Sequence, residues 1–350
     1  MKIFQTIWLT LYTALATIII KIRSLHEQIG DDSLTWEKNL NFDIGIDFRV
    51  FKRLSGSIDI YHRKTHDLIM FRPLSATTGF KGKYENAGEM INKGIEFTLA
   101  TENIKNKKIL WNTDFNFGLN RNKITKLYNS DTIEIGTKIR IEGEALQTFY
   151  LPEWAGVNSA DGSAMWYDEN GDLTRNYADA RKVIAGTADP LFTAGLNNTF
   201  TYKQFSLSFL FYLSYGNLIY NAVNEVLIND GSNLNYNQSA YSLERWQKPG
   251  DITDVPKVEW GNSSNSNKTS SRYLEDGSYL RLKNITLSYS LSPKVAQKLR
   301  LQSSRLYLQA QNLWTLTKYS GLDPEQNVKG LARYSYPNVA TVALGLEITF

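Results

Sequence analysis

The sequence closes with the nine residues Val342-Ala343-Leu344-Gly345-Leu346-Glu347-Ile348-Thr349-Phe350, in which two kinds of side chain alternate. Every second residue is apolar, and the residues between them are small or polar. A period of two predicts a β-strand with one apolar face. The strand stops on an aromatic residue with no polar tail, which is unusual for a soluble domain. We therefore expect one face of this strand to meet an apolar phase and the other to meet water.

The same alternation recurs through most of the chain. Residues 41–48 and 111–120 are the clearest cases, because each run has one largely apolar face opposite Asn, Asp and Gly. Further runs with this period lie at 95–99, 192–202, 205–215, 285–291 and 306–310. Several approach the 9 to 11 residues that a tilted membrane strand needs. The sequence thus predicts an all-β fold, an antiparallel up-and-down transmembrane β-barrel that is partial and supplies roughly ten to twelve strands of a larger barrel.

The connections between these runs differ in length, as membrane barrels require. Lys203-Gln204 and the segment 102–108 are short enough for turns on the periplasmic side. The segments 159–185 and 229–271 are long and polar, and are expected to be external loops. Asn170-Gly171 in the first of them favours a hairpin, and 293–299 is expected to form a short helical turn.

The composition excludes several classes of protein. A mean hydropathy of −0.35 argues against a polytopic helical membrane protein. The 39 basic and 35 acidic residues leave a net charge of only +4, too small over this length for a nucleic-acid partner. The absence of cysteine excludes disulfides, thiolate catalysis and zinc-thiolate sites. We expect no cofactor, no metal site and no enzymatic activity.

Residues 1–24 differ from the rest of the chain because an uncharged, mostly apolar run from Ile3 to Ile20 lies between basic residues. Ala14-Leu15-Ala16 resembles a signal-peptide cleavage site, yet the apolar run continues beyond it. As a spanning helix, the run has the minimum length for crossing a bilayer. A start spliced artefactually onto a shortened gene is a third interpretation. Residues 25–350 form the barrel portion in every case.

Several side chains could form a functional site. Five aromatic residues in predicted loops could stack on a substrate, or could instead pack the loops or sit at the membrane interface: Trp154, Trp166, Tyr167, Trp246 and Trp260. The carboxylate pairs Asp251 with Asp254 and Glu275 with Asp276 suit glycoside hydrolysis in kind, but solvated loop charges are favoured. His62 and His66 are expected at a strand end or turn, not in a metal site.

Several longer motifs, in a consistent order along the chain, carry a resemblance to a known family. The segment 245–256 has the form RW-x-KPGD-x-TDVP, and 271–284 has the form SR-x-x-EDGS-x-LRLKN. Shorter matches lie at 34–38, 86–96, 188–190, 311–315 and 319–325. Over roughly Ile29 to Phe350, the chain resembles the SusC/RagA family of TonB-dependent outer-membrane transporters.

The resemblance implies a place in the Gram-negative outer membrane and import of a large nutrient, such as an oligosaccharide or a peptide. It implies a SusD-like surface lipoprotein as partner, and energy from TonB-ExbB-ExbD acting through a plug domain. In such barrels the final strand is read by the barrel assembly machinery, so Leu344, Leu346, Ile348 and Phe350 are the expected outer-membrane insertion signal.

Nothing in the sequence resembles the plug domain, the TonB-contacting segment or the first half of the barrel. Because an open barrel leaves unpaired backbone groups in hydrocarbon, we expect a truncated or split transporter that is inactive by itself. The alternative is a surface-exposed all-β glycan-binding protein, whose strands would be nearer 5 to 6 residues long.

Overall fold

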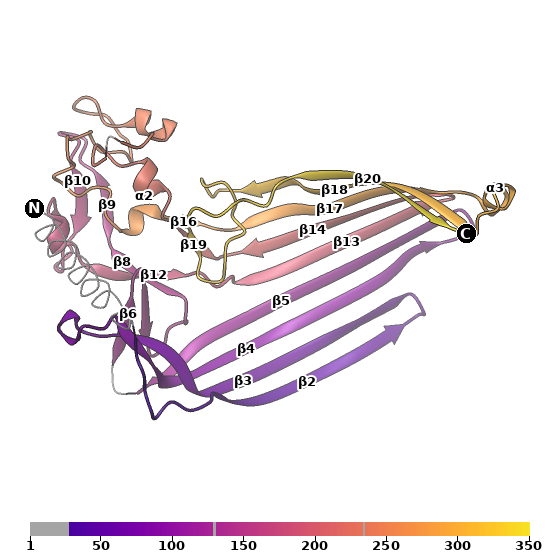
Figure 1. Ribbon diagram of the computed structural model, residues 1–350, viewed down its shortest axis with the longest axis horizontal. Coiled ribbons are helices and arrows are strands. Elements are labelled where there is room, and N and C mark those ends of the chain that lie inside the picture. Colours follow the sequence, from indigo (N-terminus) through magenta and orange to yellow (C-terminus); the bar gives the residue numbers. More distant parts are fainter. Residues whose placement is uncertain (1–27, 129–130, 234) are drawn as a thin grey trace, which may run out of the picture.

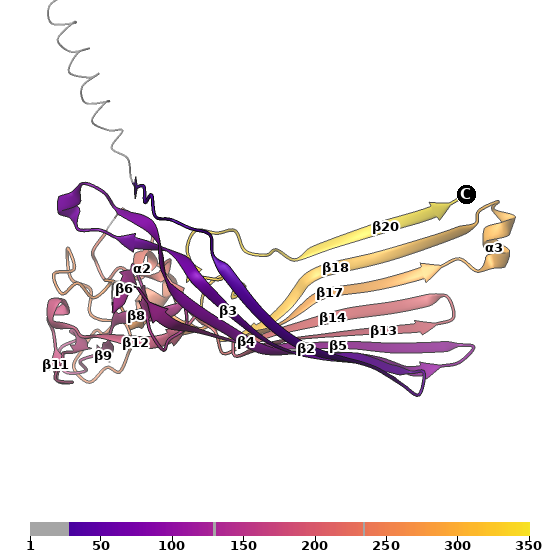
Figure 2. The same cartoon turned by 90° about the horizontal axis from the view of Figure 1, so that it is seen from below.

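The computed structural model describes residues 28–128, 131–233 and 235–350. The apolar segment predicted within residues 1–24 lies outside these ranges. One long antiparallel sheet dominates the described chain, with the order β2-β3-β4-β5-β13-β14-β17-β18-β20. Figure 1 shows these strands side by side, and Figure 2 shows that the sheet curves like a trough. Its strands are β2 (Lys38–Val50), β3 (Leu54–Pro73), β4 (Gly82–Lys105), β5 (Ile109–Leu127), β13 (Phe192–Tyr202), β14 (Phe205–Tyr215), β17 (Tyr279–Ser290), β18 (Ser303–Thr317) and β20 (Thr341–Thr349).

With the two-residue β1 (Gln28–Ile29), which pairs in parallel with β4, this sheet has ten strands. The prediction of an all-β antiparallel barrel of ten to twelve strands is therefore confirmed, and the sheet is open, as expected of part of a barrel. β3, β4 and β5 are 20, 24 and 19 residues long, about twice the predicted length. They continue past the bilayer because their pairing extends into the loop region.

Turn lengths confirm the predicted orientation. Lys203-Gln204 joins β13 to β14 with no register shift, and Lys203 adopts a positive φ of 53°. Residues 51–53, 106–108 and 291–302 complete the connections at the same end, where Figure 1 also places the C-terminus. The last of these holds α3 (Pro293–Lys298), the helical turn that the sequence predicts. The predicted strand end near His62 and His66 is wrong, because β3 runs through both and pairs them with β2 and β4.

The two faces of the sheet differ in chemistry. On one face, Leu99, Phe115 and Leu196 lie opposite one another on β4, β5 and β13. On the other face, Asp114 lies opposite Asn197. The apolar side chains of the edge strand are open, with Leu344 73% exposed. An apolar band of this extent on a closed barrel belongs against lipid, while the polar face lines a hydrated interior.

The remaining strands and helices gather at the end of the sheet opposite the C-terminus, which we call the loop region (Figure 1). One small sheet has the order β12 (Lys182–Thr187), β8 (Thr148–Pro152), β7 (Lys138–Ile141) and β6 (Thr132–Ile135). A second contains β11 (Leu173–Thr174), β10 (Ala164–Tyr167) and β9 (Trp154–Val157), and a third β16 (Leu274–Asp276), β15 (Leu218–Asn221) and β19 (Leu331–Ala332). The helical turns are α2 (Asn224–Leu227), η1 (Ala76–Thr78), η2 (Tyr177–Asp179), η3 (Ala240–Glu244) and η4 (Ser271–Tyr273). No helix among the described residues is both long enough and apolar enough to cross a membrane.

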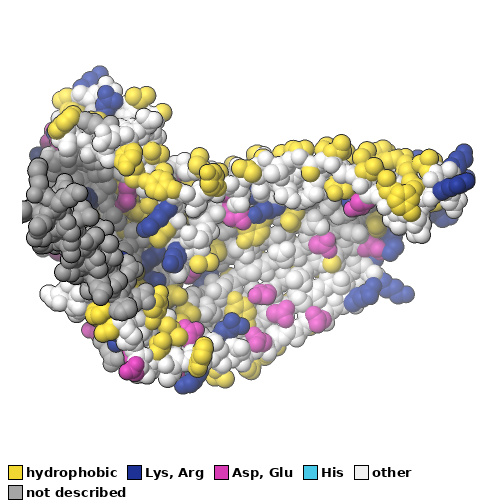
Figure 3. All heavy atoms as spheres, in the orientation of Figure 1, with side chains coloured by type: hydrophobic (Ala, Val, Ile, Leu, Met, Phe, Trp, Pro, Cys, Tyr) yellow, Lys and Arg dark blue, Asp and Glu magenta, His cyan; other side chains and the backbone are white. Residues whose placement is uncertain are grey.

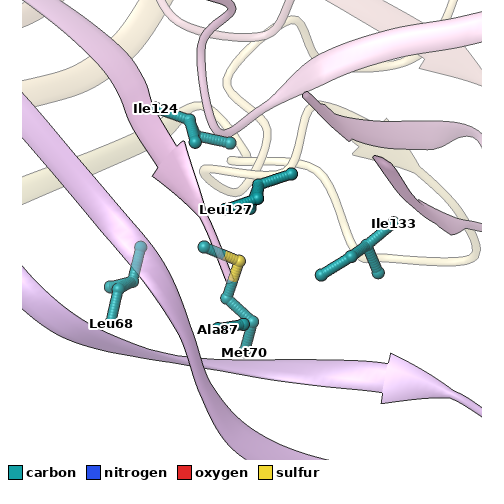
Figure 4. Packing of buried hydrophobic residues seen from close by; sticks show 6 residues of the cluster. All are labelled: Leu68, Met70, Ala87, Ile124, Leu127 and Ile133. Atoms are coloured by element: carbon teal, nitrogen blue, oxygen red, sulfur yellow. The ribbon is translucent and has the colours of Figure 1, made fainter. Parts of the chain in front are cut away.

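Buried apolar side chains join the loop region to the sheet. Figure 4 shows one cluster, in which Leu68 and Met70 of β3 meet Ile124 and Leu127 of β5, with Ala87 of β4 and Ile133 of β6 completing it. A second cluster joins Phe149 and Leu151 of β8 to Tyr220 and Tyr273. The predicted hairpin at Asn170-Gly171 is confirmed, since β10 pairs with β11 and Gly171 has a φ of 85°. These contacts fix the loop region over one end of the trough.

Candidate functional site

The concave face of the sheet is polar along its length. Figure 3 views this face and shows acidic and basic side chains scattered over it. A shallow groove of about 580 Å3 lies where β2, β3, β4 and β5 run together. Asp43, Asp59, Arg63 and Glu96 line it, and the Tyr61 hydroxyl donates to Asn120 Oδ1 over 2.9 Å. Such a surface is suited to hydrated, hydroxyl- or amide-bearing solutes.

A more enclosed pocket of about 570 Å3 lies in the loop region, and we call it the aromatic pocket. Trp154, Tyr241 and Tyr273 supply rings, and Asp254 and Glu275 supply carboxylates. Burial, and then the charge of Asp254, raises the pKa of the Tyr241 hydroxyl, so that it stays a hydrogen-bond donor at neutral pH. Rings beside carboxylates can stack on a ligand and accept its hydroxyl or amide protons.

A buried ion pair supports this pocket from behind. Arg272 Nη1 lies 2.5 Å from Asp230 Oδ2, and both side chains are almost fully buried. Ser266 Oγ donates to the same carboxylate oxygen over 2.6 Å. The Arg272 guanidinium also lies 5.1 Å from the Trp154 ring centre, within cation–π range. The orientation of the Trp154 ring is therefore set by a residue 118 positions further along the chain.

The match to a known family decides the identity. The sequence profile described as "TonB dependent receptor-like, beta-barrel" matches residues 11–313. The chain belongs to the TonB-dependent receptor family. It is 36% identical to TonB-dependent receptor P3 of Formosa agariphila over 92% of this chain and 35% of that protein. It is 30% identical to TonB-dependent receptor SusC of Bacteroides thetaiotaomicron over 91% of this chain and 32% of that protein.

The solved structure of the RagAB peptide transporter gives a TM-score of 0.82 at 30% identity, over 92% of this chain and 36% of that one. The resemblance to the SusC/RagA family is thus confirmed, and with it a place in the outer membrane of Gram-negative bacteria. The chain spans about a third of the length of the relatives it matches. These relatives are named as receptors or transporters and not as enzymes.

In this TonB-dependent receptor, the five aromatic residues singled out in the sequence do not share one site. Trp154 lines the aromatic pocket, whereas Trp166 is fully buried and packs edge-on against it, with ring centres 5.5 Å apart. Tyr167 lies under the Arg181 guanidinium. Trp246 donates to the Ser159 carbonyl, and Trp260 is 85% exposed. Most of this set therefore packs the loops or remains open at their surface.

The carboxylate pairs flagged for glycoside hydrolysis each hold local structure. Asp251 accepts the backbone N–H groups of Gln247 and Lys248 and so closes a turn. Glu275 accepts from Asn221 and from the Ser320 backbone. These bonds occupy the oxygens that an acid pair would present to a sugar.

The family motif at 271–284 anchors the long loops of the receptor to the sheet. Ser271 Oγ accepts from the Trp154 N–H, and Ser278 Oγ accepts from the Gly216 N–H. Arg281, which is 3% exposed, pairs with Asp323 over 2.5 Å and with Glu325 over 2.7 Å. The motif marks this segment in the sequence, but pairings of arginines with acids about 42 residues away carry no local signal.

Proposed function

We propose that this chain forms part of the wall and the loop cap of an outer-membrane importer for large nutrients such as oligosaccharides or peptides. One observation carries the proposal: a sheet with an apolar convex face and a polar concave face leads into a pocketed loop region. Membership in the SusC/RagA family supports it. Strands of 9 to 24 residues in the main sheet disfavour the alternative of a soluble glycan-binding sandwich.

The partners follow from the same proposal. A SusD-like lipoprotein would cover the loop region, where Ile252 and Trp260 leave large apolar side chains open at 96% and 85% exposure. TonB-ExbB-ExbD would supply energy through a plug domain. The outer edges of the sheet, β2 and β20, lack partners among the described residues. Since unpaired strand edges are costly in lipid, further strands must join both edges, and we propose that these strands alone do not transport.

The transport proposal is tested in the native host. We expect an affinity-tagged chain, extracted from outer membranes, to co-purify with a surface lipoprotein. Deleting its coding sequence should abolish uptake of one labelled oligosaccharide or peptide pool, and depleting TonB should have the same effect. Complementation with the intact coding sequence is the control. Unchanged uptake of every pool after deletion, with no lipoprotein recovered, would contradict the proposal.

The terminal strand is proposed to be the insertion signal, through Leu344, Leu346, Ile348 and Phe350. Their side chains lie on one face of β20 at a free edge of the sheet, where assembly machinery could pair with the strand. Phe350→Ser should lower the amount of heat-modifiable protein in outer membranes several-fold. Thr349→Ser, on the opposite face, is the matched control. Equal assembly of both variants would show that the terminal aromatic is not read.

A further inference from the structure

A second pocket in the loop region, about 530 Å3 in volume, is lined mainly by basic side chains. We call it the basic pocket. Figure 3 shows Lys and Arg side chains gathered where the loop region meets the concave face. Glu225 is the single acidic residue among those described as lining it, and its carboxylate accepts from the Tyr220 hydroxyl. The basic residues that line it are Lys138, Arg140, Lys182, Lys329 and Arg333.

Lys138 is the most deeply placed of these cations, at 5% exposure. Its Nζ donates to the Gln147 carbonyl over 2.8 Å and lies 3.1 Å from the centre of the Phe149 ring. Burial, reinforced by the charge of Arg140 and only partly offset by Asp189, lowers the pKa of the Lys138 amine to about 7. An ammonium group this poorly compensated gains from any anion that enters the pocket.

The other cations are also short of acidic partners. Arg140 makes only one long bond, from Nη1 to the Ile139 carbonyl at 3.5 Å, and burial lowers its pKa. Within residues 28–128, 131–233 and 235–350, no carboxylate lies within ion-pair distance of Arg140, Lys329 or Arg333. Lys182 alone has such a partner, Glu134 at 2.6 Å.

Two unpartnered polar atoms line the same pocket. Thr137 Oγ1 and Gln147 Oε1 are both buried, and neither has a hydrogen-bond partner among the described residues. Buried polar atoms are nearly always paired, so such atoms call for a ligand or another explanation. Thr137 can donate to an oxygen, and Gln147 can accept a hydroxyl or amide proton beside it.

We propose that the basic pocket binds a carboxylate group carried by the transported ligand, an inference that rests on the proposed import function. Arg140 supplies a planar fork that matches a carboxylate, and Lys138, Lys329 and Arg333 surround it with positive charge. A purely structural role would favour apolar side chains here, because burying unpaired cations is costly. Acidic sugars and acidic peptides share the recognised group.

The test uses calorimetry on the full chain extracted from outer membranes. The acidic probes are trigalacturonate and the peptide Ala-Glu-Ala; the neutral probes are trigalacturonate methyl ester and Ala-Gln-Ala. We expect one acidic probe to bind at least about tenfold more tightly than its neutral counterpart, because charge-assisted bonds are lost in the latter. The identity of that probe distinguishes a sugar from a peptide source.

Variants assign the preference to the pocket. Arg140→Gln should remove it, whereas Arg175→Gln, which breaks an exposed pair with Asp161 in the same loop region, should leave it intact. Affinity for the acidic probe should also be several-fold higher at pH 6 than at pH 8, because Lys138 is charged only at the lower pH. Arg140, Asp189, Lys182 and Glu225 are the other charged groups around it, and Lys138→Met should abolish this pH dependence.

Two outcomes would overturn the inference. Equal binding of acidic and neutral probes shows that no carboxylate is recognised. An equal loss for both kinds of probe in Arg140→Gln shows a general defect in folding. If the acidic preference persists while uptake proves independent of this chain, the import proposal fails and the pocket assignment stands. If uptake depends on the chain but no preference exists, only the pocket assignment fails.

Discussion

Replacing Asp323 by alanine is expected to destabilise the attachment of the loop between β18 and β20 by about 3–5 kcal/mol, the usual cost of removing one partner from a buried ion pair. The pair joins Arg281 on β17 to Asp323 over 2.5 Å, with side-chain exposures of 3% and 6%. Without the carboxylate, the guanidinium keeps only Glu325 and the Thr315 hydroxyl as partners. Faster trypsin cleavage after Lys329 and Arg333, followed on outer-membrane vesicles, measures the effect.

The matched control is an exposed pair. Arg305 and Glu347 lie 3.6 Å apart between β18 and β20, with side chains 45% and 59% exposed. Arg305→Ala should therefore cost less than about 1 kcal/mol. The double variant Arg281→Met with Asp323→Leu should recover most of the loss, since no unpaired charge remains. Equal cleavage of Asp323→Ala and Arg305→Ala would contradict the anchoring role of the buried pair.

The buried pair also sets a dependence on pH. Burial alone would raise the pKa of Asp323, but bonds from Arg281 and from the backbone of Asn338 and Glu325 outweigh it and hold the pKa below its ordinary 3.8. A carboxyl group with a depressed pKa contributes stability above its unfolded-state pKa and loses it as pH falls through the folded one. Loop attachment should therefore persist at neutral pH and weaken below about pH 4, and this acid sensitivity should be smaller in the double variant.

The long hairpins could be predicted from sequence because their determinants are local. The alternation in 192–202 and 205–215 and the two-residue turn between them define β13 and β14 without any distant residue. Asn198 breaks the apolar face of β13, and the period alone does not explain it. In the structure, its Oδ1 accepts from Trp111 Nε1 and Thr113 Oγ1 on β5, so the amide is paired within the apolar face.

The pockets could not be predicted in this way, because distant segments build them. The aromatic pocket depends on Arg272 meeting Asp230 across 42 positions. The basic pocket brings Lys138 of β7 near Lys329 and Arg333, which follow almost 200 residues later. Each lysine or arginine looks like an ordinary loop charge in the sequence. Only the folded loop region shows which of them lack an acidic partner.

Leu196→Arg is expected to destabilise the assembled barrel by about 2–4 kcal/mol, the cost of a basic side chain on the lipid face near the bilayer centre. Leu196 lies midway along β13 on the apolar face, opposite Phe115 of β5 and Phe211 of β14. An arginine there replaces an apolar contact and must either remain in hydrocarbon or distort the bilayer to reach water. The midpoint of urea unfolding in lipid vesicles, together with heat-modifiability, measures the loss.

The neighbouring residue provides the control for this prediction. Asn197 lies on the concave face opposite Asp114, to which its amide donates over 3.4 Å. Asn197→Arg places the same charge one residue away, beside a carboxylate and in the hydrated interior, so its cost should be small. Because one position along a strand reverses the face, the two variants differ chiefly in whether lipid or water receives the charge. Equal destabilisation by both would mean that the two faces do not meet different solvents, and the transmembrane assignment of this sheet would fail.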